Sequence, residues 1–138
     1  MTDTNAIQFR LRHTMLPVSD LERSVDFYTR LLGMTVLRRR SDPVGGRSIA
    51  YVGYDEEAMA TVLELIATEG KPVAPWAGHI AVAVSDLKAL CARLEAEGVS
   101  FAMPLKAIEN GTSRFQANIL DPDRFMIELN ELRSGLNG

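Results

Sequence analysis

The chain contains an internal repeat, which restricts it to folds built from two similar modules. His13-Thr-Met-Leu-Pro-Val18-Ser19-Asp20-Leu21 returns as His79-Ile-Ala-Val-Ala-Val84-Ser85-Asp86-Leu87, with a histidine five residues before Val-Ser-Asp-Leu in both copies. Each copy then runs through a helical pattern to a glycine and ends near a glutamate in an apolar stretch. These residues are Gly33 and Glu64 in the first copy and Gly98 and Glu128 in the second.

Strand and helix signals follow the same order in both copies. In the first copy, strands are predicted over residues 9–18, 34–40, 47–54 and 60–67, with a helix after the first strand. Ser19 and Glu22 have the spacing of a capping box, so the helix is predicted to begin at Ser19, and Gly33 is predicted to end it.

The second copy gives the same pattern. A strand is predicted over residues 79–84, a helix over 86–97, and strands over 99–103, 112–120 and 125–131. Each module is then βαβββ, and the fold class is α+β with curved mixed sheets. We expect a single domain over residues 1–138, with one module over about 9–68, a linker rich in glycine and proline over 69–77, and a second module over about 78–132.

Composition excludes several classes of partner. The net charge is -3 and the sequence pI is about 5.4, so there is no general positive field to attract nucleic acid or an anionic membrane. No segment approaches the roughly 18 apolar residues of a membrane span, and the one cysteine, Cys91, has no partner for an internal disulfide. These features are typical of a cytoplasmic protein.

The repeated histidines and glutamates have the composition of a metal site. Strand alternation places His79 with two small alanines, and places Glu128 on the face opposite Ile127 and Leu129; Glu64 has the same parity. A carboxylate among apolar strand residues is costly unless it is paired, hydrogen-bonded or bound to a metal. The predicted ligands of one divalent ion are His13, Glu64, His79 and Glu128, a nitrogen and oxygen set that suits Ni, Co, Fe, Mn or Zn.

Longer motifs resemble glyoxalase I of the short bacterial type, in the vicinal-oxygen-chelate superfamily. The resemblance runs from about Leu11 to Leu132. It rests on His13-Thr-Met-Leu-x-Val-x-Asp-Leu-x-Arg-Ser-x-Asp-Phe-Tyr28, Leu32-Gly-Met34, Tyr51-Val-Gly-Tyr54, Glu64-Leu65, Gly78-His-Ile80, Asp121-Pro-Asp123 and Ile127-Glu-Leu129. It implies a metal-dependent enzyme that converts the hemithioacetal of glutathione and methylglyoxal to S-lactoylglutathione by proton transfer through an ene-diolate.

The resemblance also implies roles and an assembly. Glu128 would be the principal base and Glu64 would face it across the site. The protein would be a homodimer with shared metal sites, in which one chain supplies His13 and Glu64 and the other supplies His79 and Glu128; the residues alone leave open whether the ligands come from one chain or two. Short members of the family favour Ni or Co.

The sequence departs from the family where glutathione is held. Pro17 stands where an arginine is common, and Thr68 stands where an asparagine is common. Arg114, Lys106 and Arg12 are candidates to replace these contacts. The alternative functions are an isomerase or epimerase of the same superfamily that acts on a substrate without glutathione, a dioxygenase, or a small-molecule binding or resistance protein. Glu64 favours the glyoxalase branch, because the dioxygenase and fosfomycin-resistance branches resemble this layout with a histidine there.

Overall fold

The computed structural model of the chain describes residues 6–74 and 76–136. The chain divides into two compact units, residues 1–71 and 72–138, here called the first and second units. Each unit contains one copy of the sequence repeat. None of the described helices is long and apolar enough to span a membrane.

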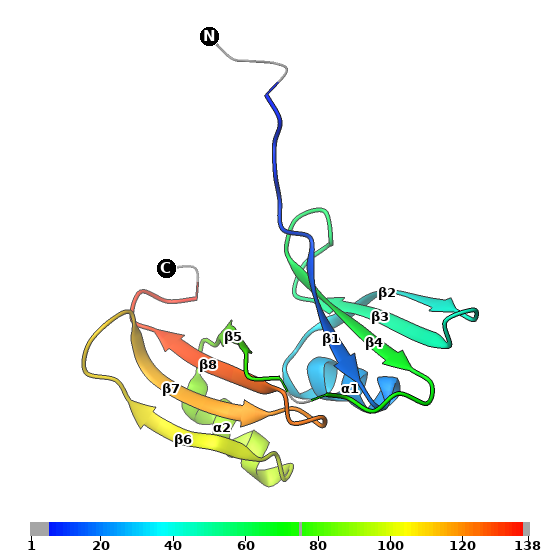
Figure 1. The fold of residues 1–138 in the computed structure, drawn as a ribbon. Coiled ribbons are helices and arrows are strands. Elements are labelled where there is room, and N and C mark those ends of the chain that lie inside the picture. Colours follow the sequence, from blue (N-terminus) through cyan, green and yellow to red (C-terminus); the bar gives the residue numbers. More distant parts are fainter. Residues whose placement is uncertain (1–5, 75, 137–138) are drawn as a thin grey trace. The chain divides into compact units, whose positions relative to one another are not determined.

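The first unit is a four-stranded mixed sheet with one helical segment (Figure 1). Its strand order is β1-β4-β3-β2, with β1 parallel to β4 and the other pairs antiparallel. The elements are β1 (His13–Val18), α1 (Leu21–Asp26), the π-helical turn η1 (Phe27–Leu31), β2 (Thr35–Asp42), β3 (Arg47–Gly53) and β4 (Val62–Thr68).

The second unit has the same topology, which confirms the predicted βαβββ order in both halves. Its strand order is β5-β8-β7-β6, with β5 parallel to β8. The elements are β5 (His79–Ala83), α2 (Leu87–Ala96), β6 (Phe101–Ala107), β7 (Ser113–Leu120) and β8 (Met126–Leu132). Mixed sheets with few helices agree with the predicted α+β class.

In each unit the helix covers one face of its own sheet. α1 contacts β3 and β4, while α2 contacts β6, β7 and β8. Between α2 and its sheet lie fully buried apolar side chains, among them Leu87, Leu94, Ile119, Ile127 and Leu129. Their burial is the main source of stability in the unit. The helix therefore leaves the other face of each sheet available for polar chemistry.

The N-cap of the first helix lies one residue later than predicted. Asp20 caps it: the backbone is extended there, and the carboxylate accepts a hydrogen bond from the Arg23 amide at 3.1 Å. Asp86 caps α2 in the same way through the Ala89 amide. The predicted capping box is wrong, because Ser19 accepts from the Arg23 guanidinium at 2.8 Å and Glu22 pairs with Arg39 at 2.6 Å.

The largest differences between predicted and observed strand boundaries are at the start of β1 and the end of β6. β1 starts at His13, not at residue 9, because its partner β4 begins at Val62, which lies opposite His13. β6 continues through Pro104 to Ala107, beyond the predicted end at residue 103. β6 is the edge strand of its sheet, where a proline without an N–H does not interrupt a ladder on both sides.

Candidate functional site

His13 and Glu64 lie together on the face of the first sheet that α1 leaves uncovered. His13 is opposite Val62, and Met15 is opposite Glu64, so the histidine and the glutamate are diagonal neighbours on one face. His13 Nε2 is 3.4 Å from Glu64 Oε1. Glu64 is only 7% exposed, and the buried Nδ1 of His13 has no hydrogen-bond partner among the described residues. The predicted first half of the ligand set is thus a close pair.

Tyr51 holds the other oxygen of Glu64. Tyr51 is opposite Glu64 in the β3–β4 register, and its hydroxyl donates to Glu64 Oε2. Its ring also meets the His13 ring edge to face, with centroids 5.8 Å apart. Tyr51 belongs to a motif of the resembled family, but it was not predicted as a site residue. The signal was present in the alternation of β3, but using it required the pairing register of two strands that are distant in sequence.

Two arginines of β2 surround this tyrosine. The Arg38 guanidinium lies 3.6 Å from the centroid of the Tyr51 ring, and Arg40 Nε donates to the Tyr51 hydroxyl oxygen at 3.3 Å. Arg38 also forms two hydrogen bonds to Glu57, of 2.6 and 3.2 Å, which hold the pKa of Glu57 below its ordinary value. The uncovered face of the first sheet therefore carries positive charge beside Glu64.

His79 and Glu128 occupy the equivalent positions in the second sheet. His79 is opposite Met126, and Ala81 is opposite Glu128, which repeats the diagonal relation of the first unit. Both side chains are on the face that α2 leaves uncovered, as their strand parity predicted. His79 is exposed and Glu128 is half-buried.

Glu128 has different hydrogen-bond partners from Glu64. Gln116 Nε2 donates to Glu128 Oε1 and Asn130 Nδ2 donates to Glu128 Oε2, both at 3.0 Å. Asn118 is opposite Glu128 in the β7–β8 register, and its side-chain oxygen accepts a 3.4 Å hydrogen bond from Gln116. Neutral amides therefore hold both oxygens of Glu128. Gln116 and Asn118 were not predicted from the sequence as site residues.

The structure thus brings the four predicted ligands together as two pairs, one in each unit. Among the described residues no cluster of three or more His, Cys, Asp or Glu side chains is arranged to hold a metal ion. Each pair supplies one imidazole and one carboxylate, which is half of the predicted ligand set.

The three basic residues predicted to bind substrate do not lie together, and each has a different neighbour. Arg12 Nη2 lies 3.9 Å from Glu57. Lys106 is opposite Gln116 in register, which places it on the Glu128 face. Arg114 Nη1 is 4.0 Å from Glu131, a carboxylate that also accepts from the first amide of α2, so Arg114 is directed toward the helix side of its sheet.

The two residues at which the sequence departs from the resembled family, Pro17 and Thr68, lie on the Glu64 face. Pro17 is opposite Ile66, and Thr68 is opposite Arg47, two residues further along β4. Arg40 is opposite Ile49 and shares this face. Arg40 and Arg47 are therefore the cations nearest in register to Pro17 and Thr68, and the sequence candidates did not include them.

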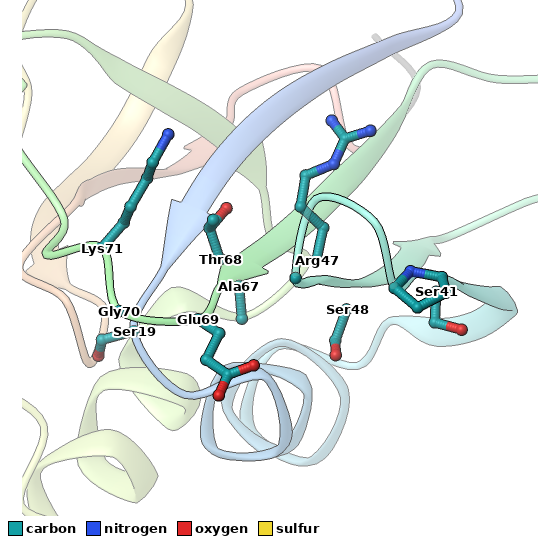
Figure 2. A pocket seen from close by; sticks show the side chains of 11 residues that line it. Ser19, Ser41, Arg47, Ser48, Ala67, Thr68, Glu69, Gly70 and Lys71 are labelled. Carbon is teal, nitrogen blue, oxygen red and sulfur yellow. The ribbon is translucent and has the colours of Figure 1, made fainter.

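A pocket of about 600 Å³ lies at the ends of these strands. Figure 2 shows Ser48, Ala67 and Glu69 directed to the α1 side of the sheet, while Arg47, Thr68 and Lys71 are directed to the other side. Arg47 is paired with Asp42 at 2.6 Å. His13 and Glu64 are not among the lining residues, so this pocket is separate from the His–Glu pair.

Comparison with known proteins agrees with this geometry. Residues 10–129 match the model of the Glyoxalase/Bleomycin resistance protein/Dioxygenase superfamily, and the chain belongs to this family. It is 41% identical over 129 residues to a lactoylglutathione lyase of Neisseria meningitidis, covering 91% of this chain and 93% of that one. It is 37% identical over 132 residues to a lactoylglutathione lyase of Escherichia coli O157:H7, covering 94% and 97%.

A solved structure extends this likeness to the fold. The trypanothione-dependent glyoxalase I of Leishmania major is 36% identical to this chain and superposes with a TM-score of 0.78, covering 92% of this chain and 89% of that one. The shared fold and the shared sequence both point to the glyoxalase I branch of the family.

Proposed function

We propose that this protein is a glyoxalase I, a lactoylglutathione lyase that converts the hemithioacetal of glutathione and a 2-oxoaldehyde into an S-2-hydroxyacyl glutathione. One observation carries the proposal: the same His–Glu pair stands at the same register on the uncovered face of both sheets. Relatives with 36–41% identity over most of the chain are named lactoylglutathione lyases or probable ones, which supports this reaction.

The family implies a divalent metal, and the side chains of both units suit one. Glu64 is buried beside a histidine whose Nδ1 has no partner, an arrangement that a cation would stabilise. We propose that His13, Glu64, His79 and Glu128 hold the ion. Nitrogen and oxygen ligands without thiolate suit Ni, Co, Fe, Mn or Zn, and Ni or Co is favoured because the chain resembles the short members of the family. Such an ion, when bound, polarises substrate oxygens and acidifies the C–H bond between them.

We further propose that the active form is a homodimer with two shared sites. Each unit supplies only two of the four ligands, on a sheet face that its own helix does not cover. In the dimer one subunit supplies His13 and Glu64 and the other supplies His79 and Glu128. Closed two-fold dimers of this kind are the commonest symmetric assemblies, and two-fold symmetry produces two identical sites.

Proton transfer is assigned to Glu128. The carboxylate removes the proton from the hemithioacetal carbon and returns it to the neighbouring ketone carbon, while the hydroxyl proton moves to the new alkoxide oxygen. Gln116 and Asn130 orient the carboxylate through one N–H each. Glu64 accepts from the Tyr51 hydroxyl, which itself accepts from Arg40, and we assign it the role of a fixed ligand that faces Glu128.

We assign the binding of the peptide carboxylates to Arg40 and Arg47. Both lie on the Glu64 face, and Arg47 is directly opposite Thr68. A guanidinium forms charge-assisted hydrogen bonds with a carboxylate, so these two residues can supply the contacts that Pro17 and Thr68 do not. Arg12 and Lys106 remain candidates for weaker contacts, and Arg114 is the least suited because of its direction toward Glu131.

The test is an assay of metal-reconstituted protein with the methylglyoxal–glutathione hemithioacetal, run beside the aldehyde without thiol. We expect thioester formation only with glutathione present, and loss of both metal and activity in the double variant His13→Ala, His79→Ala. Full metal content in the double variant would contradict the ligand assignment. Equal turnover of the aldehyde without thiol would favour an isomerase that acts on a substrate without glutathione.

A further inference from the structure

The two sheets differ in the residues that surround their glutamates. In the first sheet, the pair next to Tyr51 and Glu64 is Ile49 and Ile66, which belong to an apolar cluster. In the second sheet the same register positions are occupied by amides: Gln116 pairs with Asn130, next to Asn118 and Glu128. The second unit therefore has a half-buried group of amides at the positions where the first unit has an apolar patch.

These amides retain hydrogen-bonding groups beyond those that hold Glu128. Gln116 uses its two N–H groups on Glu128 and on the Asn118 oxygen. The Gln116 carbonyl and the two N–H groups of Asn118 have no partner among the described residues. One acceptor and two donors are therefore available on neighbouring side chains, and leaving them unpaired becomes costly once a bound substrate excludes water.

A hydroxyl group is the ligand that matches this pair of side chains. A hydroxyl both donates and accepts, so it can donate to the Gln116 carbonyl and accept from Asn118. A methyl group can do neither and would leave the amides unpaired when water is excluded. Asn118 and Gln116 adjoin Glu128, so a substituent on the carbons that Glu128 serves comes within their reach.

We propose that Gln116 and Asn118 form a subsite for a substrate hydroxyl on the carbon next to the ketone, so that the preferred 2-oxoaldehyde is a hydroxylated one. This rests on the proposed function, with Glu128 as the base. Substituting Asn118 tests the subsite without removing a hydrogen bond to Glu128. The oxygens of Glu128 accept from Gln116 and Asn130 and not from Asn118.

The experiment compares two substrates that differ by one hydroxyl. Steady-state kinetics are measured on the metal-reconstituted full chain with the glutathione hemithioacetals of 2-oxopropanal (methylglyoxal) and of 3-hydroxy-2-oxopropanal. We expect the hydroxylated substrate to have about a tenfold higher kcat/KM, the usual effect of one or two hydrogen bonds. Asn118→Ala should remove this preference, and Asn118→Ser, which keeps a donor and an acceptor, should restore part of it.

The matched control is Asn110→Ala, the same substitution in an exposed turn of the same unit, which should change neither kcat/KM value. A wild-type ratio of one or less, or a ratio that Asn118→Ala leaves unchanged, would overturn the subsite while the lyase activity stands. If the metal-loaded protein turns over neither hemithioacetal, the proposed function fails and the subsite fails with it.

Discussion

Glu64 and Glu128 show how two residues at equivalent positions acquire different hydrogen-bond partners. Both are diagonal to a histidine on an uncovered sheet face. Glu64 accepts a hydrogen bond from the Tyr51 hydroxyl, and the same hydroxyl oxygen accepts one from Arg40. Glu128 accepts hydrogen bonds from two neutral amide side chains. The chain from Arg40 through Tyr51 restrains Glu64, which suits a permanent ligand, whereas Glu128 is held by amide side chains alone.

The first prediction tests whether Tyr51 positions Glu64. Removing a group that orients a metal ligand typically weakens metal binding about 10- to 100-fold. Tyr51→Phe removes the hydroxyl that donates to Glu64 and keeps the ring against His13 and Arg38. We expect metal affinity, measured by titration of the metal-free protein with Ni or Co, to fall by about tenfold.

Tyr54→Phe is the matched control for this prediction. The Tyr54 hydroxyl donates to the Leu32 carbonyl at 2.7 Å, away from Glu64. This variant should bind the metal as tightly as the wild type. Equal affinity in Tyr51→Phe and Tyr54→Phe would mean that Glu64 needs no orienting phenol, or that it is not a ligand.

At the scale of elements, the conformation of β2 determines which residues Arg38, Arg39 and Arg40 contact. The strand directs Arg38 and Arg40 toward Tyr51, while Arg39 on the other face pairs with Glu22 of α1. The register of β2 shifts between Val36 and Arg38, so the parity of the run depends on an irregularity. A bulge of this kind changes which face each side chain occupies, and composition alone does not predict it.

The second prediction uses the two faces of β2. Arg40→Gln removes the charge assigned to a peptide carboxylate and should raise KM for the glutathione hemithioacetal about tenfold, the usual cost of a charge-assisted contact. Arg39→Gln removes the same charge from the opposite face and should leave KM unchanged. If the two variants behave alike in steady-state kinetics, the effect is one of net charge, and Arg40 has no specific contact with substrate.

The strands and helices that were predicted correctly are supported both by the internal repeat and by the alternation of apolar and polar residues. The order of strands and helices in both units was confirmed, because each apolar pattern was supported by its counterpart in the other copy. The errors have local causes. Asp20 displaced Ser19 as the cap, and β6 continued through Pro104 because it lies at an edge. The turn of π-helix over Phe27–Leu31 shares the apolar spacing of an α-helix and had no separate signal.

Only the part of the candidate site that follows from strand parity could be predicted from the sequence. Parity put each histidine and its glutamate on the same face, and the structure has them there. The residues around them, Tyr51, Gln116 and Asn118, depend on which residue of β3 or β7 stands opposite the glutamate. Cross-strand register is a long-range property that one strand does not encode by itself.

At the scale of the whole molecule, the proposed four-ligand site requires that the faces of two units come together. Each unit presents one imidazole and one carboxylate on an uncovered sheet face, and four ligands require two such faces. A chain with two units can join its own faces or exchange them with a second copy. Only the second route makes each site depend on both chains, and that dependence can be measured.

The third prediction distinguishes the two routes by mixing inactive variants under conditions where subunit exchange is demonstrated. In a mixed dimer of His13→Ala and Glu128→Ala chains, shared sites would place both lesions in one site and leave the other site intact, so activity should return. The control mixes His13→Ala with Glu64→Ala. Both lesions are then in the first unit, each site keeps one of them, and activity should stay absent. If neither mixture regains activity although exchange occurs, each chain supplies all four ligands of its own site, because every chain then carries its defect into its own metal centre.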